Sequence, residues 1–269
     1  MPKNEVHAEL YPTDAFSRLE GVEDRHFWFR ERNRLLLWCA EVLFPRTRRY
    51  LELGCGTGYV LKGFAERFPE WEIGALEYFD EGLAVASKRI ANLGVPVNLE
   101  KGDARNLSKF RDLDLIGAYD VLEHIEEDET VVSEAAKALK PGGGLLITVP
   151  QHMWLWSARD DSAGHKRRYT RDEITTKLEA AGFEIVRVTS FVSLLLPAML
   201  VSRWTEKDSA HSSRQREFAL PSFLNRIFGE LLKFERALIR SGVNLPLGGS
   251  LLVAARLPVK PVIPASYPD

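Results

Sequence analysis

Three glycines at alternate positions follow a short apolar segment, in the run Glu52-Leu53-Gly54-Cys55-Gly56-Thr57-Gly58. Glycine lets the backbone turn sharply and approach a ligand closely. The first amide groups of a helix that follows would point into the same space. Tyr59 stands where a dinucleotide-binding GxGxxG sequence requires its third glycine. An ordinary turn between a strand and a helix would use the same residues, so this run is informative only together with others.

Acidic residues follow the next three predicted strands. Glu77 ends the second strand, where a carboxylate can accept hydrogen bonds from both hydroxyls of a ribose. Asp103 follows the third strand and can accept one from an adenine amino group. Asp120 and His124 follow the fourth strand. Each residue alone is typical of a polar turn, but suitable chemistry at four successive strand ends is hard to attribute to chance.

Strands alternate with helices along most of the chain. The hydrophobic periodicity predicts strands at residues 49–53, 71–78, 97–101, 114–119, 144–149, 183–189 and 250–256. It predicts helices at 24–44, 59–68, 80–93, 128–139, 170–182 and 223–241. Gly94 is expected to cap the third of these helices, and residues 140–143 to stop the fourth. This alternation predicts an α/β fold, a mainly parallel sheet with helices on both faces.

Five runs, taken in order, resemble those of a known family: LELGCGTG, LEYF, KGDA, YDVLEHI and LKPGGGLLITVP. They are similar to class I S-adenosylmethionine-dependent methyltransferases, and within them to the type 11/12 group that includes the ubiquinone-biosynthesis O-methyltransferases. The resemblance covers about residues 50–188. It implies a seven-stranded Rossmann-like sheet with an antiparallel last strand. It also makes a nicotinamide cofactor the poorer alternative.

The resemblance implies that the protein binds S-adenosylmethionine and releases S-adenosylhomocysteine. The residues that it places around the methionine and ribose are Glu52, Gly54, Cys55, Gly56 and Gly58, with Asp120 and Val121 beside the methionine. Those that it places around the rest of the adenosine are Glu77 and Tyr78 at the ribose, and Asp103 and Ala104 at the adenine. In related enzymes an N-terminal helix supplies a cation to the cofactor carboxylate, and Arg32 or Arg30 fits that role as a bidentate donor. Alternatively, Trp28 and Phe29 pin this helix to the core and the arginines are solvated.

Methyl transfer to a hydroxyl is assisted by a base whose pKa lies near the working pH, and histidine fits. His124 after the fourth strand is the first candidate, His152 after the fifth is the second, and His165 is the third. Each is also compatible with an ordinary hydrogen-bonded turn. No Cys/His cluster has metal-ligand spacing, so no metal is expected.

A basic run precedes the helix predicted at 170–182. Arg167, Arg168 and Tyr169 are predicted to contact the acceptor, because these arginines would bind a carboxylate or phosphate. The alternative is a solvated approach to the capping box formed by Thr170 and Glu173.

About sixty residues separate the last two predicted strands, far more than a usual loop. We expect a helical insertion at 191–249 that covers the acceptor pocket. Its apolar segment 191–204 either packs as a lid or lies at a membrane surface and reaches a lipid-linked acceptor. The expected organisation is one domain, residues 1–257: an N-terminal helical cap (1–48), a cofactor-binding core (49–190), the insertion, and the last strand (250–257). A disordered tail is expected at 258–269.

Composition restricts the remaining functions. The 269 residues are 45% hydrophobic and 28% charged, which is ordinary for a globular protein, and the net charge is −2. No overall positive charge favours nucleic acid. Cys39 and Cys55 cannot form a disulfide framework, and no signal peptide or spanning segment is visible. A cytoplasmic protein, peripheral to the membrane at most, is expected. Its acceptor would be a small or lipid-linked molecule, methylated at oxygen. The alternatives are a nucleic-acid or protein methyltransferase, or a non-catalytic protein that binds the cofactor.

Overall fold

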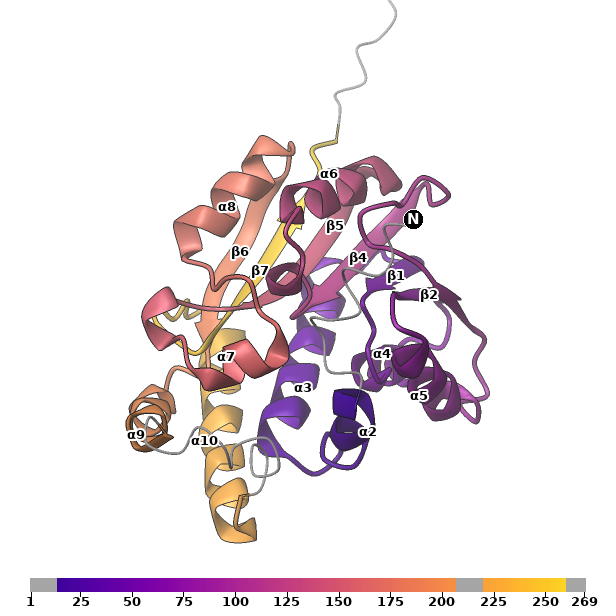
Figure 1. Ribbon diagram of the computed structural model, residues 1–269. Coiled ribbons are helices and arrows are strands. Elements are labelled where there is room, and N and C mark those ends of the chain that lie inside the picture. Colours follow the sequence, from indigo (N-terminus) through magenta and orange to yellow (C-terminus); the bar gives the residue numbers. More distant parts are fainter. Residues whose placement is uncertain (1–13, 207–219, 260–269) are drawn as a thin grey trace, which may run out of the picture.

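A single mixed sheet forms the centre of the computed structural model, which describes residues 14–206 and 220–259 (Figure 1). Its strand order is β3-β2-β1-β4-β5-β7-β6. Strands β1 to β5 pair in parallel, and β7 runs antiparallel to both β5 and β6. The seven strands, with the antiparallel one last, confirm the predicted sheet. Their bounds are β1 Arg49–Leu53, β2 Glu72–Glu77, β3 Val97–Lys101, β4 Leu113–Tyr119, β5 Leu139–Pro150, β6 Glu184–Phe191 and β7 Ser250–Arg256.

Helices cover both faces of this sheet because alternate strand residues point to opposite sides. Tyr50 and Leu115 pack with α3, α4, α5 and α10 on one face. Their neighbours Leu51 and Ile116 pack with α6 and α8 on the other. The helices are α2 Asp14–Glu20, α3 Phe27–Leu43, α4 Tyr59–Arg67, α5 Asp80–Ile90, α6 Asp128–Ala138, α7 Ala158–Ala163, α8 Arg171–Ala180, α9 Leu196–Glu206 and α10 Ser222–Arg240.

Several predicted boundaries are wrong. Helix α6 ends at Ala138, just before the predicted stop at 140–143, but strand β5 already begins at Leu139 and not at 144. Gly142 within this strand adopts a φ of +80°. Helix α5 ends at Ile90, and Gly94 with its φ of +68° belongs to the following turn instead of capping the helix. Helices α2 and α7, of seven and six residues, are too short for a clear apolar period and were not predicted. Helix α9 was expected only as part of a helical insertion, without bounds of its own. The capping box of α8 is confirmed.

The insertion after β6 packs on the N-terminal helix. The side chain of Asn225 on α10 accepts a hydrogen bond from the Phe27 amide at 2.9 Å, where α3 begins. Arg236 on α10 donates to Glu31 on α3 at 2.9 Å. Glu235 is buried and accepts a hydrogen bond from the Leu194 amide at 2.8 Å. Helix α10 therefore ties α3 to the end of β6.

The apolar part of the insertion is divided between core and surface. Phe191, Val192 and Leu195 are buried, so the first part of 191–204 belongs to the core. Leu200 and Val201 on α9 are exposed. In the parts of the chain that the structure covers, we find no helix long and apolar enough to cross a membrane. Residues 207–219 of the insertion and 260–269 of the predicted tail lie outside the described residues.

Candidate active site

One cavity opens at the carboxyl ends of strands β1 to β4, between α2 and the loop that follows α7. Most of the cofactor residues that the sequence analysis proposed meet there, although they come from four different strand ends. The residues that line the cavity are Phe16, Gly54, Gly56, Glu77, Tyr78, Phe79, Asp103, Arg105, Asp120, Val121, His124, Ile125 and Gly164. Glu52, Cys55, Gly58, Ala104 and Arg32 are absent from this lining.

The glycine loop leaves no room for side chains at two positions. Gly54 has a φ of +62°, and a Cβ there would lie 2.8 Å from Cγ2 of Val121. Gly58 has a φ of +74° at the start of α4, and a Cβ there would lie 3.0 Å from the Cβ of Ala86. Cys55 is buried between them. The loop thus brings backbone to the cavity where side chains would otherwise fill it.

Glu77 connects strand β2 to the glycine loop. Its carboxylate accepts hydrogen bonds from the amides of Gly56 at 2.7 Å and Phe79 at 2.9 Å. Burial raises the pKa of Glu77, and these backbone amides partly offset the shift. A carboxylate held in this way at the cavity wall can accept further hydrogen bonds from the vicinal hydroxyls of a sugar.

Asp103 reaches the cavity from the end of β3 and has a cationic partner. Arg105 donates to its carboxylate at 2.7 Å through Nη2 and at 3.1 Å through Nε. Arg105 also lines the cavity and bonds Glu127 at 2.8 Å. Sequence analysis missed Arg105, whose only signal is its position two residues after the acid.

Arg32 forms an ion pair with Asp120, which is the acid at the end of β4. The guanidinium of Arg32 is buried and stacks over Trp28 at 4.4 Å. The alternative in which the arginines of this helix are solvated is therefore wrong for Arg32, whereas Arg30 is exposed. Asp120 has a φ of +56°, which turns the chain sharply beside the Gly54 loop.

Glu52 lies behind the loop instead of in the cavity. It is buried and accepts a hydrogen bond from the Tyr50 hydroxyl at 3.1 Å. Burial raises the pKa of Glu52 to about 8, although Tyr50 and the nearby charge of Arg32 oppose the shift. Glu52 therefore acts on the cavity only through the residues in front of it.

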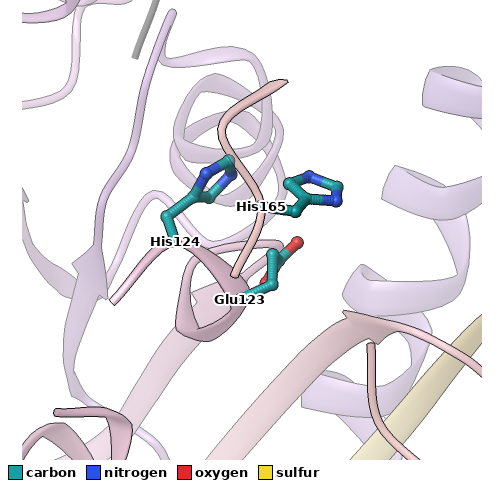
Figure 2. Close-up of side chains that lie close together, drawn as sticks. All are labelled: Glu123, His124 and His165. Carbon is teal, nitrogen blue, oxygen red and sulfur yellow. The ribbon is translucent and has the colours of Figure 1, made fainter. Parts of the chain in front are cut away.

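The three candidate histidines occupy different environments. His124 lines the cavity, and burial, with the nearby charge of His165, lowers its pKa to about 3. His165 lies beside His124, with 4.8 Å between the ring centroids (Figure 2). Its Nδ1 is 2.9 Å from the carboxylate of Asp160. His152 is not among the residues that line the cavity, and its ring stacks on Trp154. The structure thus brings two of the three together.

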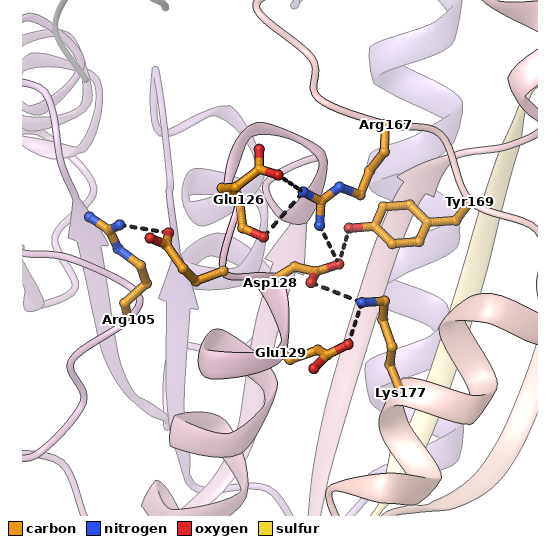
Figure 3. Close-up of polar contacts among 8 residues, drawn as sticks. Arg105, Glu126, Asp128, Glu129, Arg167, Tyr169 and Lys177 are labelled. Atoms are coloured by element: carbon orange, nitrogen blue, oxygen red, sulfur yellow. Dashed lines mark hydrogen bonds and ion pairs between the residues drawn. The ribbon is translucent and has the colours of Figure 1, made fainter. Parts of the chain in front are cut away.

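The basic run before α8 forms contacts within the protein. Arg167 pairs with Asp128 at 3.1 Å, and the Tyr169 hydroxyl donates to the same carboxylate at 2.7 Å (Figure 3). Arg168 is buried and donates to Asp160 at 2.7 Å. None of the three is among the residues that line the cavity, and their contact with the acceptor stays a prediction. Arg167 and Arg168 pair with the buried acids Asp128 and Asp160.

Sequence analysis missed two further residues, one that lines the cavity and one that holds the glycine loop. Phe16 on α2 is buried against the loop, 3.9 Å from where a Cβ on Gly56 would lie. Glu23, which follows α2, is buried and bonds both the Thr57 hydroxyl and Arg89 at 2.7 Å. No local spacing signals either residue, because both act across long distances in the chain.

Known proteins are similar to this chain in sequence or in fold. A probable S-adenosylmethionine-dependent methyltransferase of Mycolicibacterium smegmatis is 28% identical over 194 residues, 68% of this chain and 69% of that protein. A ubiquinone biosynthesis O-methyltransferase of Dechloromonas aromatica is 24% identical over 113 residues, 41% of this chain and 48% of that protein. The structure of phosphoethanolamine N-methyltransferase 2 of Haemonchus contortus with S-adenosylmethionine superposes with a TM-score of 0.53 and 19% identity, over 82% of this chain and 53% of that one.

The sheet order, the glycine loop and the acids at successive strand ends define an S-adenosylmethionine-dependent methyltransferase of class I. The family model described as a methyltransferase domain matches residues 22–188, more than half of the chain. The protein belongs to this family. Its predicted resemblance to the ubiquinone-biosynthesis group is also confirmed among its relatives.

Proposed function

We propose that the protein transfers the methyl group of S-adenosylmethionine to an oxygen atom of a small-molecule or lipid-linked acceptor. The observation that carries this proposal is the cavity itself, which is lined by Glu77, Asp103, Asp120 and His124 together. Oxygen as the methylated atom is supported by the similarity to an enzyme named as an O-methyltransferase.

In this proposal the cofactor spans the cavity. Glu77 accepts hydrogen bonds from the ribose hydroxyls, and Asp103 faces the adenine. Arg32 binds the methionine carboxylate, and Asp120 exchanges its present partner for the cofactor ammonium group. The guanidinium is already held by stacking on Trp28, so little side-chain entropy remains to be lost on binding.

The reaction is an in-line displacement. A lone pair of the acceptor oxygen forms the new C–O bond while the C–S bond breaks, and its electron pair stays on sulfur as S-adenosylhomocysteine is formed. The acceptor hydroxyl also releases a proton. Alignment and exclusion of water are the main demands on the protein.

His124 is a poor base for the proton that the acceptor hydroxyl releases. With a pKa of about 3, this histidine is neutral at pH 7 but a weak base. His165 does not line the cavity itself, but its neighbour Gly164 does, and Asp160 orients its ring through Nδ1, so it is the best placed of the three candidates. His152 has a lowered pKa as a result of burial and is not among the cavity-lining residues.

A lipid-linked acceptor is supported by exposed apolar side chains on the insertion. Val201 on α9 is 63% exposed, and Phe223 on α10 is 64% exposed. Arg226 and Lys233 on α10 add the basic character that suits a headgroup region. Co-sedimentation with liposomes of neutral and anionic lipid checks this part. No binding to either kind of liposome would restrict the acceptor to soluble molecules.

Calorimetric titration with S-adenosylmethionine and S-adenosylhomocysteine tests the core of the proposal, with NAD as the control ligand. Wild type should bind the first two at micromolar concentrations, and Glu77→Ala should bind them at least tenfold more weakly. Glu72→Ala at the exposed end of the same strand is the matched control and should bind like wild type. A folded wild type that binds neither ligand would contradict the proposal. Binding without formation of S-adenosylhomocysteine from any phenolic or lipid-linked acceptor would favour a non-catalytic role.

A further inference from the structure

Three potential metal ligands meet beside the cofactor cavity. Glu123 and His124 lie in the 3-10 turn after β4, and His165 lies in the loop after α7. One carboxylate oxygen and one nitrogen from each ring all lie within 4.8 Å of one another. Figure 2 shows the two rings and the carboxylate grouped at the point where these two segments meet.

Glu123 is the most unusual member of this group. Its side chain is fully buried, and neither of its carboxylate oxygens has a hydrogen-bond partner among the described residues. Burying a carboxyl group without a partner costs free energy, and burying its charged form costs far more. A cation bound at this position would account for an acid that otherwise only destabilises the fold.

The surroundings hold the three side chains in place. The carboxylate of Asp160 lies 2.9 Å from Nδ1 of His165, which leaves Nε2 of that ring for another contact. Asp160 is itself held by Arg168 at 2.7 Å. The amide of Lys166 donates to the carbonyl of Glu123 at 2.7 Å and so ties the loop to the turn. A carboxylate that orients a histidine through its second nitrogen is the usual outer shell of a metal site.

We propose that Glu123, His124 and His165 bind a divalent first-row transition-metal ion in the wall of the cofactor cavity. Two imidazoles and one carboxylate suit zinc, iron(II), cobalt or manganese, whereas magnesium and calcium prefer all-oxygen sites. Three protein ligands leave at least one coordination position open. The expectation that no metal binds came from local spacing, and spacing cannot reveal ligands that come from two distant segments.

The position of the site gives the ion a role that rests on the proposed function. His124 and Gly164 line the cavity, so the open coordination position would be reached from the cavity. An acceptor hydroxyl bound there would lose its proton to solvent more readily, because a divalent cation lowers the pKa of a bound oxygen ligand. His165 would then be a ligand and would not act as the base.

Metal titration of the full chain tests the site without requiring an acceptor. After treatment with a chelator, wild type is titrated with Co²⁺ and Zn²⁺ by calorimetry, and Co²⁺ binding is followed by its visible absorption. We expect one equivalent of either ion to bind. The variants Glu123→Gln and His165→Ala should each bind at least tenfold more weakly. Glu126→Gln, which changes an exposed carboxylate three residues away, is the matched control and should bind like wild type.

The outcomes separate this proposal from the proposed function. Binding of S-adenosylmethionine by Glu123→Gln at wild-type affinity would show that the variant is folded, so weak metal binding would then arise from the lost ligand. Wild type that binds S-adenosylmethionine but neither metal would overturn the site and leave the methyltransferase proposal standing. Metal binding that both variants retain would place the ion elsewhere. Turnover that a chelator leaves unchanged would return His165 to the role of base.

Discussion

At the scale of single residues, Arg32 is positioned to recognise one group of the cofactor. Its guanidinium lies against Asp120 and over Trp28, at the cavity end assigned to the methionine. Arg32→Gln should therefore weaken binding of S-adenosylmethionine by about tenfold or more, because a hydrogen bond to a charged group contributes roughly 1.5–3 kcal/mol. Binding of 5′-methylthioadenosine, which has no carboxylate, should change little. Calorimetry of both ligands checks this, with Arg30→Gln on the exposed side of α3 as the control. An equal loss for the two ligands would contradict the assigned contact.

Gly54 is the residue of the glycine loop at which a side chain is least tolerated. Alanine there would place a Cβ against Val121 and would hold an L-residue at a φ of +62°, which costs roughly 1–2 kcal/mol. Gly54→Ala should lower the free energy of unfolding and abolish cofactor binding. Adding Val121→Ala should recover part of the stability, since it removes the clash but leaves the backbone strain. Chemical denaturation of the single and double variants measures both. If the double variant is no more stable than Gly54→Ala alone, the close contact with Val121 is not the cause of the lost stability.

At the scale of elements, α10 determines how the N-terminal helix is placed. Asn225 is the only α10 side chain described here that bonds the start of α3 at both the Phe27 amide and the Arg25 carbonyl. Asn225→Ala should cost about 1 kcal/mol of stability, as the loss of a helix cap does. It should also weaken cofactor binding several-fold, although α10 does not touch the cavity, because α3 carries Arg32. Hydrogen exchange of residues 27–32 together with calorimetry checks this. The neighbouring Arg226→Ala is the control, and equal effects of the two variants would contradict a specific cap.

The helices and strands also show which features of the site can be predicted from the sequence alone. The strands and the acids that end them follow from local periodicity, so Glu77, Asp103 and Asp120 were predicted together with their positions at one edge of the sheet. Interactions between distant segments left no such pattern. The sequence predicts that Arg168 contacts the acceptor, or alternatively is solvated, yet it is buried and donates to Asp160. The grouping of Glu123 with His165 likewise depends on how the loop after α7 folds back over β4.

For the molecule as a whole, buried carboxyl groups make stability depend on pH. Burial raises the pKa of Glu23, Glu77 and Glu235, and that of Glu52 to about 8. Between pH 4.5, the ordinary value, and these raised values, the folded state binds more protons at these groups than the unfolded state. Each of these carboxyl groups therefore lowers the free energy of unfolding as the pH rises through this range, by up to about 1.4 kcal/mol per pH unit. His26, His124 and His152 act in the opposite direction below pH 6.5, because burial lowers their pKa in the folded state.

Glu52 allows this whole-molecule effect to be tested with one substitution. Glu52→Gln keeps an acceptor for the Tyr50 hydroxyl but cannot ionise. The variant and wild type should have similar stability near pH 4.5, and the variant should become progressively more stable than wild type up to about pH 8. Urea denaturation at intervals across this pH range measures the difference in free energy of unfolding between the two proteins. The titration of all other groups cancels in this difference. If the two curves of stability against pH run parallel, Glu52 has the same pKa in the folded and unfolded states. A nearby charge such as that of Arg32 would then compensate for its burial.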